Sequence, residues 1–325
     1  MPAADHASEH PKTRVGSRVV IYVALAANIL IATGKFIAAS ISGSSAMWSE
    51  GVHSLVDSVN EVLLLYGIHR SGAKPSPSHP LGYGREIYFW SFLVAVIVLA
   101  FGAGLSFYEG VIHFRDPRSI EKPIWSLLML GFAFAFEGTS WLFTLREFRA
   151  HKGKSGYFEA FRRSKDPTVF TVLLEDTAAL IGLLIAFAGL VLALAFDEPR
   201  LDAIASIAIG LLLTATSMFL ARETKSLLIG EAAYGHVRDC ILKIAAEDPG
   251  IRKINGLITV QMGPDQVMAA MSAEFEDALT TPQIENCIKR IETRVKELRE
   301  EVTTLFVKPQ TPETFQDNLD DWLRD

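Results

Sequence analysis

Long apolar stretches separated by short polar ones make up residues 19–221 of the chain. A helix needs about 20 apolar residues to cross a hydrocarbon core roughly 30 Å thick. By this criterion the sequence predicts six membrane-spanning helices, at residues 19–40, 46–68, 86–113, 122–146, 169–196 and 202–221. The second is predicted in spite of its charges, because a "SGSS" turn precedes it and a polar segment with three prolines follows it.

The pattern changes after Arg222 to that of a small soluble domain. A segment with helical spacing ends in Pro-Gly, two alternating segments are joined through "GPDQ", and a charged amphipathic helix precedes a last alternating segment. This αββαβ order predicts an α+β domain. We therefore expect four parts: an N-terminal cytosolic tail (1–18), a six-helix transmembrane domain (19–221), a cytosolic C-terminal domain (222–308) and an acidic tail (309–325).

The composition agrees with a membrane protein that carries a soluble appendage. Half of the 325 residues are hydrophobic, 21% are charged, and the mean hydropathy is +0.26, which is high for a soluble domain. The net charge of -6 gives no indication of a nucleic-acid partner. The two cysteines, Cys240 and Cys287, stand far apart without CxxC spacing, so we expect no disulfide framework.

Positively charged residues indicate the orientation of the chain. With six spans, the N-terminal tail and the loops after the second and fourth helices lie on one side, and they carry more lysines and arginines than the loops on the other side. Such segments face the cytoplasm, so we expect both termini to be cytoplasmic. The localisation that we expect is that of an integral multi-pass protein in a bacterial inner (plasma) membrane.

One face of the second predicted helix is polar. Its titratable side chains are spaced three, four and four residues apart and fall on one stripe: Glu50, His53, Asp57 and Glu61. Burying each charge in a bilayer costs roughly 2.5 to 3.5 kcal/mol or more. These groups either neutralise one another near a helix end or line a polar pathway, and four in one stripe favour the pathway. Lys35 of the first helix either pairs with one of these carboxylates or extends to a membrane interface.

Two residues of this stripe suit a metal ion. The imidazole and carboxylate of His53 and Asp57, four residues apart, converge on one point and form half of a site for a divalent cation. Other helices must supply the rest: the fifth carries Glu175 and Asp176 among leucines, and the fourth carries Glu137. A negative cluster in the bilayer is tolerable only if a cation or protons compensate it. This requirement favours an ion path.

The motifs resemble those of a known transporter family. The cation diffusion facilitator family of zinc and related metal transporters has a similar arrangement of six spans, a cytosolic αββαβ domain and motifs such as "GSSAMWSEGVHSLVDSVNEVLLLYG" followed by "HPLGYGR". Its zinc transporter 9-like branch is most similar in "SEGVHSLVD", "SHPLGY", "GAGLSFYEGV" and "LLEDTAALIG". The resemblance covers residues 25–230 by motif and the C-terminal domain by pattern only.

The resemblance implies a homodimer, with the C-terminal domain as its dimerisation domain, that exports cytosolic Zn²⁺ in exchange for protons. In this family, two residues of the second helix and two of the fifth form a tetrahedral metal site. The first pair corresponds to His53 and Asp57. Asp176 corresponds to the last ligand, because Gly182 follows it at the family's spacing, but Val172 stands where the family has its other fifth-helix ligand.

The identity of the fourth ligand therefore stays open. Glu175 is adjacent to Asp176 but is turned about 100° around the helix, and Glu137 could reach in from the fourth helix. Of these two alternatives we favour Glu175. Glu50 and Glu61 are the expected proton relays, and both remain alternatives for a metal ligand.

The candidate ligands favour transport over catalysis. No nucleophile or HExxH motif accompanies them, so we expect neither an enzyme nor a cofactor. Zn²⁺ is the expected substrate, with Co²⁺, Fe²⁺ and Mn²⁺ as alternatives, because an imidazole shifts preference from Mg²⁺ towards Zn²⁺. The alternatives to an antiporter are a metal channel and a membrane protein of the same fold with a structural or chaperone-like role.

Overall fold

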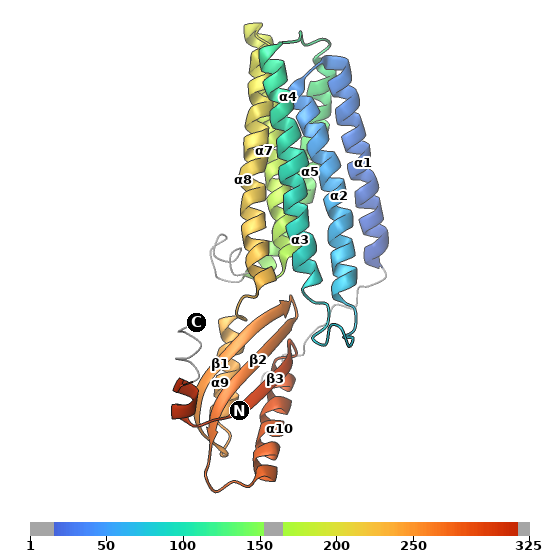
Figure 1. Cartoon of the computed structure of the whole chain (residues 1–325). Helices are drawn as coiled ribbons and strands as arrows, with labels where there is room; N and C mark the ends of the chain where they lie inside the picture. Colours follow the sequence, from blue (N-terminus) through green and yellow to red (C-terminus); the bar gives the residue numbers. More distant parts are fainter. Residues whose placement is uncertain (1–15, 153–164, 318–325) are drawn as a thin grey trace, which may run out of the picture. The chain divides into compact units, whose positions relative to one another are not determined.

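The computed structural model of the chain describes residues 16–152 and 165–317 (Figure 1). Its first part consists of the helices α1 (Gly16–Ser42), α2 (Ser45–Ser71), α3 (Glu86–Ile97), η1 (Val98–Ala103), α4 (Gly104–Arg115), α5 (Ile124–Lys152), α7 (Pro167–Phe196) and α8 (Arg200–Ile229). Its second part consists of α9 (Gly235–Ala246), β1 (Ile251–Gly263), β2 (Gln266–Phe275), α10 (Thr281–Leu298) and β3 (Val302–Pro309).

Four helical segments in the described residues are long and apolar enough to cross a membrane: Glu86–Arg115, Ile124–Arg146, Phe170–Phe196 and Arg200–Ile229. The predicted class of α-helical membrane protein is therefore confirmed. The helices α1 and α2 each contain 27 residues, about 40 Å of helix, which is also long enough to span. The count of six spans stays a prediction for these two.

The helix α8 ends later than its apolar stretch predicts. The stretch indicates an end at residue 221, whereas α8 continues to Ile229 and is followed by Gly230, whose φ of +123° suits glycine. The charged residues beyond the stretch, among them Arg222, Glu223 and Lys225, are good helix formers. The first charged residues after the apolar stretch therefore do not mark the end of the helix.

The segment Glu86–Arg115 is one helix of 30 residues with an irregular middle. The six residues of η1 are π-helical, so each backbone hydrogen bond there spans one more residue than in an α-helix. Val98, the first residue of η1, lies in a small apolar cluster with Val52 and Val56 of α2. The irregular turn therefore packs against the part of α2 that carries the polar stripe.

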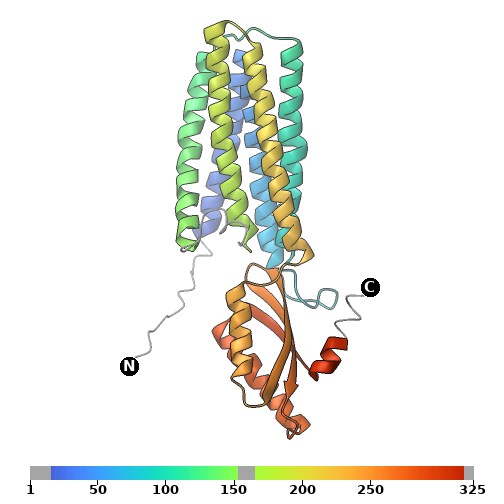
Figure 2. The ribbon, with the colours of Figure 1, turned by 90° about the vertical axis from the view of Figure 1, so that its left-hand side faces the viewer.

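Two compact units can be distinguished in the described chain. The first comprises the residues up to Val62, Ile97–Ser140 and Asp176–Thr214. Its helices lie side by side (Figures 1 and 2). A Cβ atom at Gly110 of α4 would lie 2.8 Å from the backbone nitrogen of Ile207 of α8, so these two helices touch at their backbones. Small residues at such contacts let membrane helices pack closely.

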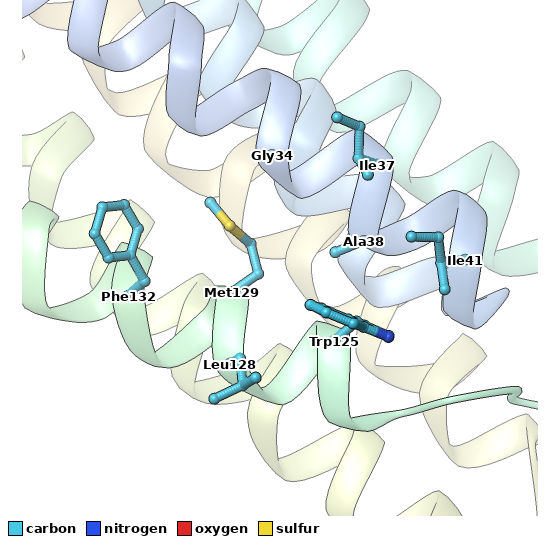
Figure 3. Close-up of a pocket in the computed structure, with 8 residues that line it drawn as sticks. All are labelled: Gly34, Ile37, Ala38, Ile41, Trp125, Leu128, Met129 and Phe132. Carbon is cyan, nitrogen blue, oxygen red and sulfur yellow. The ribbon is translucent and has the colours of Figure 1, made fainter.

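The helix α1 has an apolar outer side and a polar inner side. Ile37 and Ile41 are 56% and 40% exposed, whereas Lys35 is fully buried. Between α1 and α5 lies an apolar hollow of about 240 Å³, whose lining includes Ile37, Ile41, Trp125 and Phe132 (Figure 3). Exposed apolar surface of this kind suits the hydrocarbon of a bilayer. The pattern agrees with α1 as a membrane-spanning helix.

The second unit comprises Leu63–Val96, Trp141–Glu175 and the residues from position 215 onward, and it contains the sheet β1-β2-β3. Strand β1 pairs antiparallel with β2, and β3 pairs parallel with β2 after the crossover helix α10. The helices α9 and α10 lie on one side of the sheet (Figure 2), where Ile241 and Ile291 pack with Met271. The predicted αββαβ order is confirmed.

The two predicted tails lie only partly within the described residues. The tail expected at residues 1–18 is described from Gly16, where α1 begins, and only part of the tail expected at 309–325 is described. In that part, the ring of Phe315 lies close to β1, since a Cβ atom added at Gly256 would be 2.6 Å from it. The C-terminal segment therefore packs on the sheet at this point.

Candidate metal centre

The polar stripe of α2 faces the interior of the first unit. Within the stripe, the exposed fraction is 0% for Glu50 and 1% for His53, while Asp57 and Glu61 are partly exposed; Asn60, beside the stripe, is 0% exposed. On other sides of the same helix, Leu55 and Val59 are 47% and 43% exposed. The helix therefore turns its polar residues towards its neighbours and apolar ones outward, as a membrane-spanning helix with a polar pathway requires.

His53 and Asp57 form a close pair in this stripe. His53 Nδ1 lies 3.4 Å from Asp57 Oδ1, as a spacing of four residues on a helix predicts. Neither ring nitrogen of His53 has a hydrogen-bond partner among the described residues, although the residue is 1% exposed. Because buried polar groups are normally hydrogen-bonded, these nitrogens make His53 a candidate ligand for a cation.

Lys35 of α1 joins two of the expected carboxylates. Its Nζ donates to Glu50 Oε2 at 3.1 Å and to Glu137 Oε1 at 2.8 Å. It also donates to Ser54 Oγ at 2.7 Å. Of the two alternatives for Lys35, pairing with carboxylates is confirmed, and extension to an interface is wrong because the side chain is fully buried. One ammonium group thus connects α1, α2 and α5, and it holds two of the alternative metal ligands.

Glu61, further along the stripe, has a different partner on α1. Asn28 Nδ2 donates a hydrogen bond of 2.7 Å to Glu61 Oε1. In the described part of the chain, Glu61 Oε2 has no hydrogen-bond partner. Asn28 and Lys35 are seven residues apart and so share one face of α1. Reasoning from the sequence missed Asn28, and its spacing from Lys35 is the signal that could have indicated it.

The N-terminus of α2 is fixed by a carboxylate from α8. Asp202 Oδ2 accepts hydrogen bonds from the backbone N–H groups of Ser45 at 2.6 Å and Ala46 at 3.2 Å. Its Oδ1 accepts one from Ser44 Oγ at 2.7 Å. A negative group at this position satisfies the first N–H groups of the helix and interacts favourably with the helix dipole. Local sequence patterns cannot reveal the contact, because Asp202 is 156 residues from Ala46.

The helix α7 comes close to the stripe at Gly182. A Cβ atom added there would lie 2.5 Å from Glu50 Oε1, which is shorter than real contacts of Cβ atoms. The missing side chain therefore makes room for the Glu50 carboxylate. Gly182 is also the glycine that lies six residues after Asp176. This distance is the reason why Asp176 corresponds to the last ligand of the family motif.

The remaining predicted ligands lie on α7. Asp176 is partly exposed and belongs to the first unit, whereas Glu175 is 8% exposed and ends a segment of the second unit. Within residues 16–152 and 165–317, no three His, Cys, Asp or Glu side chains gather into a group that could hold a metal ion. The ligand set of His53, Asp57, Asp176 and Glu175 therefore stays a prediction.

Comparison with known proteins shows what the chain is similar to. Residues 21–229 match the family described as the cation efflux transmembrane domain. The chain is 32% identical over 268 residues, 82% of its length, to the proton-coupled zinc antiporter SLC30A9, mitochondrial, of Xenopus laevis. It is 29% identical over 84% of its length to metal tolerance protein C4 of Arabidopsis thaliana. It is 25% identical over 66% of its length to the manganese efflux system protein MneP of Bacillus subtilis.

These alignments cover different shares of the relatives. They include 48% of the Xenopus protein, 60% of the Arabidopsis protein and 69% of the Bacillus protein. The chain therefore spans about half the length of the SLC30A9 relative. The names of all three relatives refer to metals, and one name refers to zinc and protons.

Replacing Gly182 tests the contact between α7 and the buried carboxylate. In Gly182→Ala the added methyl would lie 2.5 Å from Glu50 Oε1, so the carboxylate must move, and we expect a loss of about 1–3 kcal/mol of stability. Thermal unfolding of the chain in detergent measures this loss. Gly131→Ala on α5 is the matched control, since apart from the adjoining residues of its own helix no described atom lies within 4 Å of its added Cβ. Equal melting temperatures for the two variants would contradict the contact.

Proposed function

We propose, because the chain belongs to the cation efflux family, that it is a secondary transporter which exports a divalent metal ion, principally Zn²⁺, from the cytosol in exchange for protons. The observation that carries this proposal is the pair of His53 and Asp57, since the buried imidazole makes no hydrogen bond among the described residues. An imidazole and a carboxylate one turn apart are half of a zinc-type site. The name of one relative, a proton-coupled zinc antiporter, supports the same substrate and coupling.

The metal site that we propose consists of His53, Asp57, Asp176 and Glu175. Helices α2 and α7 each supply two of these residues. Glu137 is not included, because the ammonium group of α1 already binds it. One imidazole with three carboxylates is a harder and more negative site than one with two imidazoles, so it should discriminate less sharply against Mn²⁺ or Fe²⁺.

Competition between metal ions and protons at this site would couple the two fluxes. His53 and Asp57 must be deprotonated to bind a metal ion, so binding of the metal releases protons and protons displace the metal. In a carrier whose site faces one side of the membrane at a time, this competition produces exchange. Glu61 is the proposed relay, because its partner is the neutral amide of Asn28, whereas Glu50 is paired with the ammonium group of Lys35.

The chain is an integral membrane protein, and we further propose its arrangement. It has six spans with both termini in the cytoplasm, and it forms a homodimer through the C-terminal domain. The excess of lysine and arginine in the loops supports this orientation. A bacterial inner (plasma) membrane is the proposed location. A relative from Bacillus subtilis supports it, while other relatives carry mitochondrial names.

A metal channel, a membrane protein without transport and an enzyme are the alternative functions. A channel passes metal ions without moving protons in exchange, and a protein with a structural role shows no flux. The sequence has no HExxH motif, so we propose no hydrolytic reaction. Liposomes that contain a zinc indicator and a pH dye distinguish antiport from the first two alternatives.

Replacing either residue of the α2 pair should stop transport. His53→Ala and Asp57→Ala should each abolish Zn²⁺ flux and the coupled pH change in liposomes, because each removes a proposed ligand from the metal ion. The matched control is His113→Ala on α4, since His113 Nδ1 also has a carboxylate four residues away, Glu109, at 3.1 Å. This control should keep both signals. Retained Zn²⁺ flux in either α2 variant would show that the site is wrong, and Zn²⁺ flux without a pH change in the unmodified chain would identify a channel.

Binding measurements should identify the fourth ligand. Glu175→Gln should weaken Zn²⁺ binding more than Glu137→Gln. Loss of a residue outside the ligand set typically lowers metal affinity about 10- to 100-fold, and loss of a ligand lowers it further. Val172→His should raise the preference for Zn²⁺ over Mn²⁺, because it places an imidazole one turn before Asp176. Competition titrations of the purified chain with the two ions provide both results. An equal or larger loss in Glu137→Gln would exclude Glu175 as the ligand.

A shortened chain tests the proposed dimer. A chain that ends at Gly230, just after α8, lacks the whole α+β domain. It should be largely monomeric while its Zn²⁺ affinity changes little, because no proposed ligand lies in that domain. Light scattering of the detergent-solubilised protein, with the full-length chain as the control, measures the mass. A shortened chain that remains dimeric would contradict this role of the domain.

A further inference from the structure

The ammonium group of Lys35 occupies a buried cage of oxygen atoms. These oxygens are Glu50 Oε2 at 3.1 Å, Glu137 Oε1 at 2.8 Å and Ser54 Oγ at 2.7 Å. An ammonium group has three donors, so its hydrogen-bonding capacity is fully used. The side chains of Lys35 and Glu50 are fully buried and that of Glu137 is 16% exposed. Water therefore has little access to this cage.

The same three oxygens have the chemistry of a metal site. Two carboxylates and a hydroxyl around one point are the kind of ligands that hard divalent ions such as Mn²⁺ and Mg²⁺ prefer. The α2 helix supplies two of them and α5 supplies the third. Mg²⁺ binds oxygen at about 2.1 Å, so the oxygens would have to close in by up to about 1 Å relative to their distances from Nζ.

Lys35 compensates only part of the charge of the cage. The ionised carboxylates of Glu50 and Glu137 carry two negative charges, and the ammonium group carries one positive charge. Glu50 Oε1 and Glu137 Oε2 make no hydrogen bond within the described part of the chain. A divalent ion would balance both carboxylates. Without the lysine, the cage therefore has both the ligands and the charge of a second cation site.

We propose that Lys35 is a specificity-determining residue: a tethered cation that fills this cage and confines the transported metal ion to the pair of His53 and Asp57. The proposal rests on the transport function proposed above. A tethered ammonium group cannot diffuse away, so ions that prefer oxygen ligands find the cage occupied. The site that contains an imidazole stays available to Zn²⁺. Lys35 thus keeps Mn²⁺ and Mg²⁺ out of this second position without touching the transported ion.

Removing the tether tests the proposal, with Mn²⁺ as the probe because its paramagnetic resonance signal distinguishes free from bound ion. The full chain in detergent carries Asp57→Asn in every sample, which disables the proposed transport pair. On this background, Lys35→Met should bind one additional Mn²⁺ per chain, with an affinity at least about tenfold above that of the chain that keeps Lys35. Mg²⁺ in excess should displace part of this bound Mn²⁺.

Two matched variants show whether the added binding belongs to the cage. Lys35→Arg keeps a cation in place and should bind no additional Mn²⁺. The double variant Lys35→Met with Glu137→Gln has the same formal charge in the cage as the unmodified chain but only one carboxylate. It should lose most of the additional binding. Additional Mn²⁺ binding that persists in the double variant would place the ion elsewhere and overturn the proposal.

Lys35→Met leaves two buried carboxylates without their counter-ion, so this variant is solubilised both with and without Mn²⁺. Recovery of monodisperse protein only with Mn²⁺ is an expected result, because the ion then replaces the ammonium group. Absence of bound Mn²⁺, or absence of folded protein under both conditions, overturns the proposal. Zn²⁺ binding by the unmodified chain, and its loss in Asp57→Asn, tests the transport site separately. Failure of the proposal for Lys35 can therefore be distinguished from failure of the proposed transport site.

Discussion

Charges on α2 have to be compensated inside the bundle, because an unpaired charge in apolar surroundings costs several kcal/mol. The arrangement of the neighbouring helices follows from this requirement. Lys35 from α1 binds Glu50, and the same ammonium group draws in a carboxylate from α5. Asn28 donates to Glu61, and Asp202 from α8 accepts from the first N–H groups of α2. The polar face and the N-terminus of α2 are therefore bound by residues of α1 and α8, and Lys35 links this face to α5.

His53 differs from the other polar residues of this face. It is 1% exposed, and its ring nitrogens have no hydrogen-bond partner among the described residues. Glu50 and Glu61 of the same stripe are bound by residues of α1, whereas His53 has Asp57 of its own helix at 3.4 Å. A protein interior rarely leaves a buried imidazole in this state unless the imidazole has a further role. The metal-binding role proposed above for His53 fits the membership of the chain in the cation efflux family.

Apolar length predicted most of the helices, and residue spacing predicted which side chains share the polar face of α2. Neither pattern identifies a partner on another helix. Lys35 is 15 residues from Glu50 and 102 residues from Glu137, and Asp202 is 156 residues from the backbone group that it binds. A lysine within an apolar stretch is recognisable as unusual, but the choice among several carboxylates depends on how the helices pack. Adjacent carboxylates on α7 are equally ambiguous, because one residue corresponds to about 100° of rotation.

The π-helical turn η1 affects how this span can be aligned with related chains. A π-helical turn accommodates one more residue than an α-helical turn. A relative with a regular helix here would need a gap of one residue within Val98–Ala103 for the faces on both sides to correspond. Without that gap, every position of Gly104–Arg115 is compared with a neighbour that points about 100° away. Residues of α4 that look unrelated in an ungapped alignment can therefore be equivalent in space.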